Sequence, residues 1–183
     1  MLTLRRLSRA TRCDFLSLFD EITGKDCYCV AWHRKSWAEF DSGCPSNREL
    51  RTALIDAGRS DGFLFYDGQH CIAWCQATRA DDLPNLAATF PQLPLHDRWA
   101  ITCLRLRSDY RGKGLGTEIV RLAVDALVQT GITSILAFPH RYEHFNQDEV
   151  WTGTVGMFQR CGFDVIGDDA EGVVMEINGG QTN

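Results

Sequence analysis

The sequence lacks any apolar run that approaches the roughly 20 residues of a membrane-spanning helix. Its first residues also lack the pattern of a signal peptide, because Arg9, Arg12 and Asp14 interrupt the stretch where an apolar core would have to lie. A basic excess is missing too: the formal net charge is -5, which argues against a nucleic-acid-binding surface. We therefore expect a cytoplasmic protein that binds neither membranes nor nucleic acid.

The chain contains 183 residues, of which 44% are apolar, and this is the range of one domain with a sizeable core. We expect a single domain spanning residues 1–183. Eight cysteines are present, but without an export signal they favour free thiols over a disulfide framework.

A zinc site is one reading of Cys27, Cys29 and Cys44 together with His33, since thiolates and imidazoles are zinc ligands. The Cys-x-Cys spacing lacks the usual two-residue gap, and no second pair of cysteines follows at zinc-ligand spacing. We therefore expect no metal.

Periodicity predicts helices alternating with strands, which indicates an α/β or α+β sheet domain. Ser46 and Glu49 form a capping box for a helix whose apolar side would carry Leu50, Ala53, Leu54 and Ala57. The prolines between residues 79 and 97 predict an irregular connection there. The expected helices cover residues 11–22, 46–57, 114–130 and 151–160, and the expected strands cover 63–66, 71–77, 99–107, 132–138, 163–166 and 173–177.

The segment that carries the chemistry is Arg111-Gly112-Lys113-Gly114-Leu115-Gly116-Thr117, which lies between the strand at 99–107 and the strongest helix. The first turn of a helix has amides without intrahelical partners and the positive end of the helix dipole. Glycines let a phosphate approach the backbone closely, and the two basic side chains add local positive charge. We therefore interpret this segment as a phosphate-binding loop, against the alternative of a glycine-rich turn without a ligand.

Two other phosphate-binding motifs fit less well. A nucleoside-triphosphate loop has Ser or Thr after Gly-Lys, but Gly114 follows Lys113 here. A dinucleotide fold has Gly-x-Gly-x-x-Gly near its first strand, whereas this chain has Gly-x-Gly-x-Gly after about a hundred residues.

The spacing Arg111-x-x-Gly114-x-Gly116 resembles the signature of the GNAT superfamily of N-acetyltransferases. Tyr110, the flanking strand and helix, and the later Met157-Phe158-Gln159-Arg160-Cys161-Gly162-Phe163 follow the family's order, so the resemblance covers about residues 61 to 177. The segments 27–32 and 73–75 also look like a bacterial subgroup of ill-defined substrate. The resemblance implies a mixed, mostly antiparallel sheet flanked by helices.

The resemblance also implies a binding site for an acyl-coenzyme A, with acetyl-CoA as co-substrate. Backbone groups of Leu104, Arg105 and Leu106 would pair with the pantetheine arm, and the loop Arg111, Gly112, Lys113, Gly114, Leu115, Gly116 and Thr117 would hold the pyrophosphate. The thioester would lie at a gap between strands near Cys103 and Ile135.

The chain departs from the family at both usual acid-base positions, where it has Cys103 instead of glutamate and Phe158 instead of tyrosine. Our hypothesis is that the missing groups come from Glu143 and His144, which cluster with His140, or from Tyr142 as acid; the alternative is a polar surface loop. We expect the Cys103 thiol to be buried and inert; the alternative is that it acts as a nucleophile that accepts the acyl group.

Together these features predict an N-acyltransferase that acts on a small amine by direct attack, as a monomer or homodimer. A non-catalytic acyl-CoA sensor is the rival hypothesis. Trp32, Trp37, Trp74 and Trp99 are candidates for the wall of an acceptor pocket or for core positions, and the sequence leaves that choice open.

Overall fold

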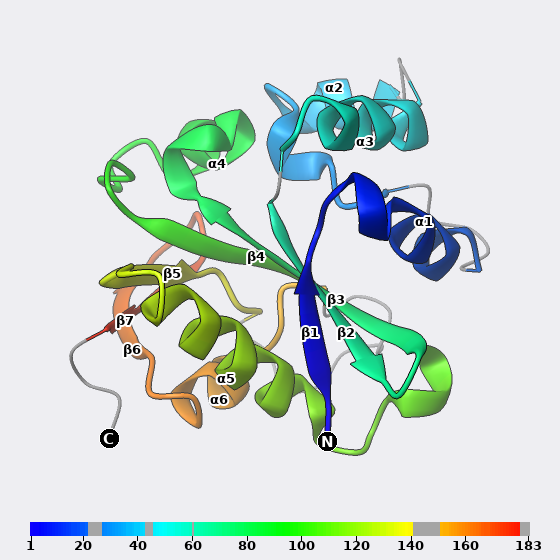
Figure 1. The fold of residues 1–183 in the computed structure, drawn as a ribbon. Helices are drawn as coiled ribbons and strands as arrows, with labels where there is room; N and C mark the ends of the chain where they lie inside the picture. The colour runs from blue at the N-terminus through cyan, green and yellow to red at the C-terminus, as the bar shows by residue number, and fades with distance from the viewer. Residues whose placement is uncertain (22–26, 43–45, 60, 141–150, 180–183) are drawn as a thin grey trace.

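The computed structural model describes residues 1–21, 27–42, 46–59, 61–140 and 151–179 (Figure 1). Its strands are β1 (Thr3–Arg6), β2 (Gly62–Asp67), β3 (His70–Arg79), β4 (Trp99–Leu106), β5 (Ser134–Ala137), β6 (Asp164–Asp168) and β7 (Val173–Asn178). Its α-helices are α1 (Arg12–Asp20), α2 (Trp37–Ser42), α3 (Asn47–Asp56), α4 (Pro84–Thr89), α5 (Leu115–Val128) and α6 (Val155–Gln159). In this part of the chain, no helix is both long and apolar enough to cross a bilayer.

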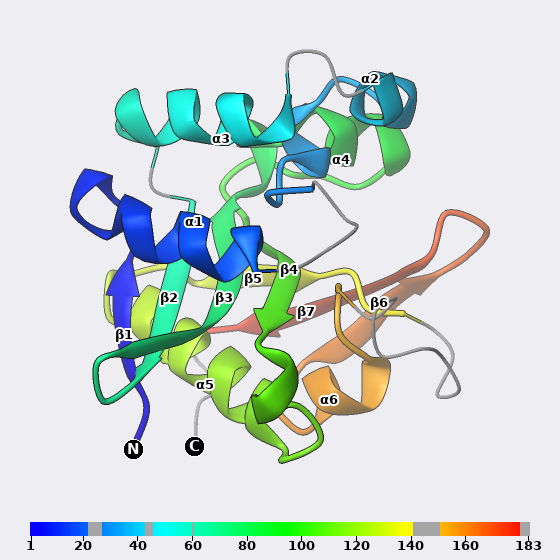
Figure 2. The ribbon, with the colours of Figure 1, turned by 90° about the vertical axis from the view of Figure 1, so that its right-hand side faces the viewer.

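One seven-stranded sheet runs through the molecule in the order β1-β2-β3-β4-β5-β7-β6. All neighbouring strands are antiparallel except β4 and β5, which run parallel. Figure 2 shows α1, α2, α3 and α4 above this sheet and α5 and α6 below it. The predicted mixed, mostly antiparallel sheet flanked by helices is confirmed.

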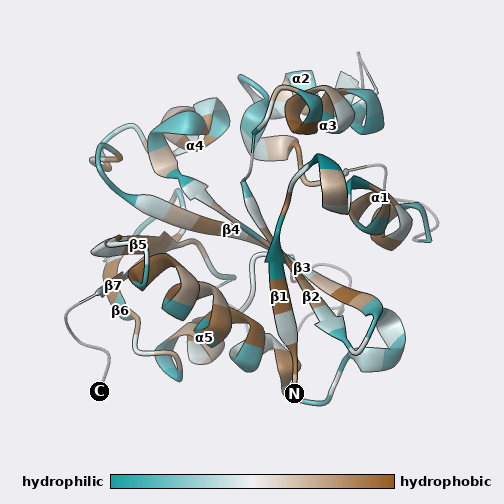
Figure 3. Cartoon of the chain, in the orientation of Figure 1, coloured by the Kyte–Doolittle hydropathy of each residue, from teal (hydrophilic) through white to brown (hydrophobic). Residues whose placement is uncertain are grey.

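The largest buried cluster lies between α5 and the sheet. Ile119, Ala123 and Leu127 pack from the helix against strand residues such as Ile101 and Ile135. Figure 3 shows the brown, apolar stretches of α5 beside the equally apolar middle of β4. Burial of this stripe fixes α5, and therefore its N-terminus, against the sheet.

Several short elements depart from the sequence prediction. Residues 79–97 contain the helix α4, whose Pro84 stands in its first turn, where proline costs no intrahelical bond. The helix expected from residue 151 begins only at Val155, because Gly153 is left-handed (φ 79°) and Thr154 caps the helix by accepting a hydrogen bond from the Met157 amide. The elements β1 and α2 were not predicted.

The buried side of α3 also differs from the prediction. Ser46 and Glu49 do form the capping box, but Ala53 and Ala57 are exposed, and Leu50 and Leu54 are only half-buried. The buried positions are Asn47, Arg51 and Ile55. A guanidinium therefore occupies a core position, and its partners, described below, explain why.

Candidate active site

The glycine-rich loop joins β4 to α5 as the sequence predicts. Gly112 and Gly114 adopt left-handed conformations (φ 72° and 76°), and a side-chain carbon at either position would meet no atom of the described residues beyond its chain neighbours within 4 Å. Arg111 closes the loop onto the strand, since its Nε donates to the Leu106 carbonyl at 3.1 Å. Lys113 lies at the exposed tip, with Nζ 5.4 Å from the Tyr110 ring centre.

The amides of this loop are available to a ligand. None of the described residues accepts a hydrogen bond from the amides of Gly112, Lys113, Gly114, Leu115 or Gly116. The Thr117 amide, by contrast, donates weakly to the Gly114 carbonyl at 3.3 Å. Because α5 is 14 residues long, its dipole adds to these amides, and the arrangement is suited to bind an anion such as a phosphate.

A gap opens beside β4 because this strand separates from β5 halfway along its length. The two strands pair only from Trp99 with Ile135 to Ile101 with Ala137. The register between β3 and β4 then skips Thr102, which is the extra residue of a β-bulge. Bulges bend a strand and often lie next to active sites. The gap therefore begins beyond Ala137, and the expectation that it lies near Ile135 is wrong, since Ile135 is paired.

Backbone groups of the chain itself enter this gap. The Leu104 amide donates to the Trp151 carbonyl at 2.6 Å, and the His140 amide donates to the Gly153 carbonyl at 2.9 Å. Residues 151–154 therefore lie between β4 and the chain that follows β5. On the other side of the bulge, the Thr102 carbonyl accepts from the Trp32 indole at 3.2 Å.

Strand geometry decides which parts of β4 face the gap. Backbone groups alternate between the two neighbouring strands, and the Arg107 amide bonds back to Ile72 on β3. Leu104 and Leu106 consequently present their main chain to the gap, whereas Arg105, paired with Trp74, presents its main chain to β3. The predicted backbone contact at Arg105 does not fit this register.

Both positions that replace the usual acid-base residues are buried. Phe158 packs in the core against Phe163, with ring centres 5.0 Å apart. Cys103 lies beside Cys29, and a hydrogen bond with that thiol, together with burial, raises the pKa of Cys103 well above its usual value. A thiol that resists deprotonation is a poor nucleophile, so the arrangement favours the inert reading of Cys103.

Of the predicted acid-base cluster, only His140 lies within the described residues; Tyr142, Glu143 and His144 lie outside them. His140 forms a parallel bridge with Thr154 at the edge of the gap. Its Nε2 is buried and has no hydrogen-bond partner in the described part of the chain. A buried imidazole nitrogen without a partner is costly unless a ligand or another group completes it.

A buried polar cluster that the sequence did not predict supports the bulge. Arg51 Nη1 and His33 Nε2 both lie 2.6 Å from Oδ2 of Asp61, and Gln76 Nε2 lies 3.2 Å from the same atom. Thr102 completes the chain of contacts by donating to Gln76 Oε1 at 2.9 Å. Burial by itself raises the pKa of Asp61, but Arg51 and His33 outweigh it and hold that pKa well below its usual range.

Arg51 also stabilises an unusual turn. It donates to the carbonyls of Tyr28 and Cys29, two residues with positive φ (37° and 54°). Such conformations cost about 1–3 kcal/mol each in non-glycine residues, and the planar fork of the guanidinium offsets part of that cost. This explains why α3 buries an arginine.

Two of the four tryptophans considered for an acceptor pocket lie beside the gap. Trp32 packs edge-to-face with Trp37 and at a tilt to Phe138 and Trp151, with ring centres 5.1, 6.4 and 6.0 Å apart. Trp74 instead packs in the core, and Trp99 lies under Arg6. The rings around Trp32 form the aromatic cluster at the gap, which consists of Trp32, Trp37, Phe90, Phe138 and Trp151.

The candidate zinc ligands do not form a site in the described part of the chain, where no three His, Cys, Asp or Glu side chains gather as metal ligands would. Cys44 lies outside that part. Cys27 and Cys29 belong to the buried cluster under α1 instead.

Comparison with known proteins identifies the family to which this chain belongs. Residues 27–163 match the family model described as Acetyltransferase (GNAT) family. No curated protein matches the sequence significantly. Since the family model covers most of the chain, the assignment does not depend on any single relative.

Solved structures show the same fold at low identity. An acetyltransferase of the GNAT family from Listeria monocytogenes has a TM-score of 0.60 and 11% identity, over 97% of this chain and 94% of that one. An aminoglycoside acetyltransferase solved with coenzyme A has a TM-score of 0.58 and 18% identity, over 97% of this chain and 95% of that one. PaiA N-acetyltransferase from Thermoplasma acidophilum, also solved with coenzyme A, has a TM-score of 0.54 and 15% identity, over 97% of this chain and 99% of that one. With its loop, opened sheet and family match, the chain belongs to the GNAT family of acetyltransferases and is a transferase.

Proposed function

We propose that the protein transfers an acetyl or related short acyl group from an acyl-coenzyme A to the nitrogen of a small amine. The observation that carries this proposal is the row of five amides from Gly112 to Gly116, none of which has an acceptor among the described residues, at the N-terminus of α5 next to the opening between β4 and β5. Two of the structurally similar acetyltransferases were solved with coenzyme A, which supports the choice of co-substrate.

The loop residues bind the pyrophosphate of the coenzyme in this proposal. Its oxygens accept hydrogen bonds from the amides, and Lys113 adds a positive charge that the acidic chain as a whole does not supply. Arg111 contributes by fixing the loop to Leu106. A weaker contribution is expected from the Thr117 amide, because it already donates to Gly114.

The pantetheine arm follows the gap-facing backbone of β4. Leu104 and Leu106 are the residues whose main-chain groups can pair with it, and Arg105 is not. Because the Leu104 amide bonds to the Trp151 carbonyl in this structure, pairing at that amide requires Trp151 to be displaced. The thioester then lies beyond Ala137, near the Thr102 bulge.

The reaction forms a carbon–nitrogen bond and breaks the carbon–sulfur bond of the thioester. The attacking amine loses one proton, and the coenzyme thiolate gains one. We assign the proton-accepting role to the group formed by His140, Glu143 and His144, with Tyr142 as the candidate acid. His140 has the support that its Nε2 is buried at the gap without a described partner.

Two measurements test the proposal. Acetyl-CoA at 100 times its dissociation constant is expected to stabilise the folded protein by about 2.7 kcal/mol. Release of free coenzyme A thiol over a panel of primary amines then measures transfer. Stabilisation without turnover of any amine would favour a non-catalytic sensor. If millimolar acetyl-CoA produces neither stabilisation nor turnover, the proposal is refuted.

A further inference from the structure

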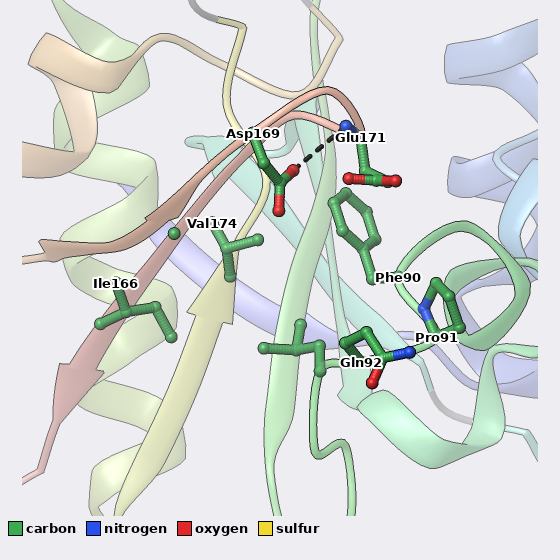
Figure 4. A pocket seen from close by; sticks show the side chains of 9 residues that line it. Phe90, Pro91, Gln92, Ile166, Asp169, Glu171 and Val174 are labelled. Carbon is green, nitrogen blue, oxygen red and sulfur yellow. Dashed lines mark hydrogen bonds between the residues drawn. The ribbon is translucent and has the colours of Figure 1, made fainter.

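A hollow of about 240 Å³ lies between the segment that follows α4 and the β6–β7 hairpin, away from the gap. Figure 4 shows Asp169 at one end of the hollow, where its carboxylate accepts a hydrogen bond from the Glu171 amide at 3.1 Å. The described residues that line the hollow include none from β4, none from β5 and none of residues 151–154. The polar contacts of β4 at the gap are instead those of Thr102.

The bulge at Thr102 decides which residues of β4 turn their main chain toward the gap. The Ala77 amide bonds to Asp61 on the β2 side, so its partner Ile101 turns its main chain to β5. Beyond the bulge, it is Leu104 that faces that side. Odd-numbered residues therefore face β5 before Thr102, and even-numbered residues face the gap after it. The one extra residue of the bulge produces this change of phase.

Thr102 is held in place through two of its polar groups. Its hydroxyl donates to Gln76 Oε1 at 2.9 Å, and its carbonyl accepts from the Trp32 indole at 3.2 Å. The extra residue of a bulge is left out of the ladder, so its carbonyl needs a partner of this kind. Thr102 and Gln76 are both fully buried, and water does not compete for the bond between them. These two contacts keep the bulge at this position of β4.

The contacts of Gln76 fix the orientation of its amide group. Its Nε2 lies 3.2 Å from Oδ2 of Asp61 and 3.2 Å from the Cys29 carbonyl, and both of these oxygens are acceptors. The Asp61 carboxylate is itself paired with Arg51 at 2.6 Å. The nitrogen of Gln76 therefore has to face these oxygens, and Oε1 faces Thr102. In this way a buried ion pair orients Gln76, and Gln76 orients the bulge.

We propose that Gln76 and Thr102 are positioning residues for acyl transfer. Gln76 holds the Thr102 bulge, and the bulge sets the main chain of Leu104 and Leu106 in the phase at which it pairs with the pantetheine arm. The arm in turn places the thioester beside the bulge, in line with the attacking amine. This inference rests on the proposed function and adds the residues that align its co-substrate.

The first experiment removes the Thr102 hydroxyl and separates turnover from binding. Thr102→Val keeps the branched shape of the side chain, and we expect it to lower kcat about tenfold, because small displacements of aligned reactants cost this much or more. The dissociation constant of acetyl-CoA is expected to change less than about threefold, because the loop amides still bind the pyrophosphate. Thr102→Ser retains the hydroxyl and is expected to keep most of the kcat. A loss of affinity as large as the loss of kcat would contradict a positioning role.

A matched control makes the same substitution away from the gap. Thr11→Val removes another buried hydroxyl, which donates to the Arg6 carbonyl at 3.1 Å beside α1. It is expected to lower the midpoint of urea unfolding about as much as Thr102→Val and to leave kcat unchanged. Equal kcat values in the two variants would overturn the inference and leave the proposed function standing. Absence of both turnover and stabilisation by acetyl-CoA in the wild type would refute the proposed function, and this inference with it.

A variant of Gln76 tests the other end of the same hydrogen bond. Gln76→Met keeps the length of the side chain and is expected to lower kcat about tenfold as well, so the inference stays testable even if Thr102→Val does not fold. When both substitutions are combined, we expect no further loss of kcat, because the two side chains act through one bond. An unchanged kcat in Gln76→Met, or a combined loss equal to the product of the single losses, would overturn the role of Gln76.

Discussion

Replacement of Gly114 by alanine is expected to weaken acetyl-CoA binding at least tenfold, whereas the same replacement at Gly58 is not. Both glycines are left-handed, with φ of 76° and 80°, and in the described part of the chain an added side-chain carbon at either one would meet no atom within 4 Å apart from its chain neighbours. The two substitutions therefore impose the same backbone strain without a clash. They differ in that Gly114 lies in the phosphate-binding loop and Gly58 follows α3, far along the chain from it.

The expected cost in stability is small and equal for the two variants. An L-residue in the left-handed region costs about 1–2 kcal/mol, and the restricted unfolded chain offsets about 0.4–1 kcal/mol of that. We expect the free energy of unfolding of each variant to be about 1 kcal/mol lower than that of the wild type. Urea unfolding without ligand measures this baseline.

The ligand separates the two variants. The open space around the Gly114 position is where the phosphate oxygens are expected, so an added carbon obstructs their approach. At a concentration of 100 dissociation constants, acetyl-CoA adds about 2.7 kcal/mol to the unfolding free energy, and a tenfold weaker affinity reduces this to about 1.4 kcal/mol. Gly58→Ala is expected to keep the full increment. An undiminished increment in Gly114→Ala would refute the assignment of the loop.

Three further predictions concern the buried cluster and the thiols. Arg51→Met leaves the Asp61 carboxylate buried without its cation, so urea unfolding is expected to show a loss of about 3–5 kcal/mol; a loss under about 1 kcal/mol would contradict the role of Arg51. Burial lowers the pKa of His33 in the folded protein and outweighs the opposite effect of Asp61. The contribution of His33 to the free energy of unfolding is therefore complete above the pKa of the unfolded imidazole, about 6.5, and is lost as the pH falls below that value. Unfolding free energies at about pH 7.5 and pH 5 are expected to differ less in His33→Asn than in the wild type; equal differences would exclude His33 as the cause. Iodoacetamide at neutral pH is expected to modify the exposed Cys13 and spare Cys103, and an acyl adduct on Cys103 after incubation with acetyl-CoA would restore the nucleophile hypothesis.

Local patterns predicted the elements that position the site. The glycine-rich loop, the strand before it and the amphipathic helix after it are encoded within about thirty consecutive residues, and period and capping signals suffice to recognise them. The capping box at Ser46 and Glu49 was recognised for the same reason. The buried side of α3 was not, because the partners of Arg51 are Asp61 and two carbonyls of the 28–29 turn, which only the fold brings together.

The aromatic cluster at the gap was only partly predicted from the sequence, which named Trp32 and Trp37 as candidates but not Phe90, Phe138 or Trp151. These residues come from separate segments, and no spacing in the sequence marks them as neighbours. The bulge at Thr102 is equally invisible in sequence, since it depends on the register between β3 and β4. That register also decides that Leu104 and Leu106, but not Arg105, face the gap.

The most direct measurement of the central claim is a titration of ¹⁵N-labelled protein with coenzyme A, followed by the backbone amide resonances. We predict that the largest shifts fall on Gly112, Lys113, Gly114, Leu115 and Gly116, whose amides have no acceptor among the described residues. Saturable binding that leaves these five resonances unmoved while others shift would contradict it.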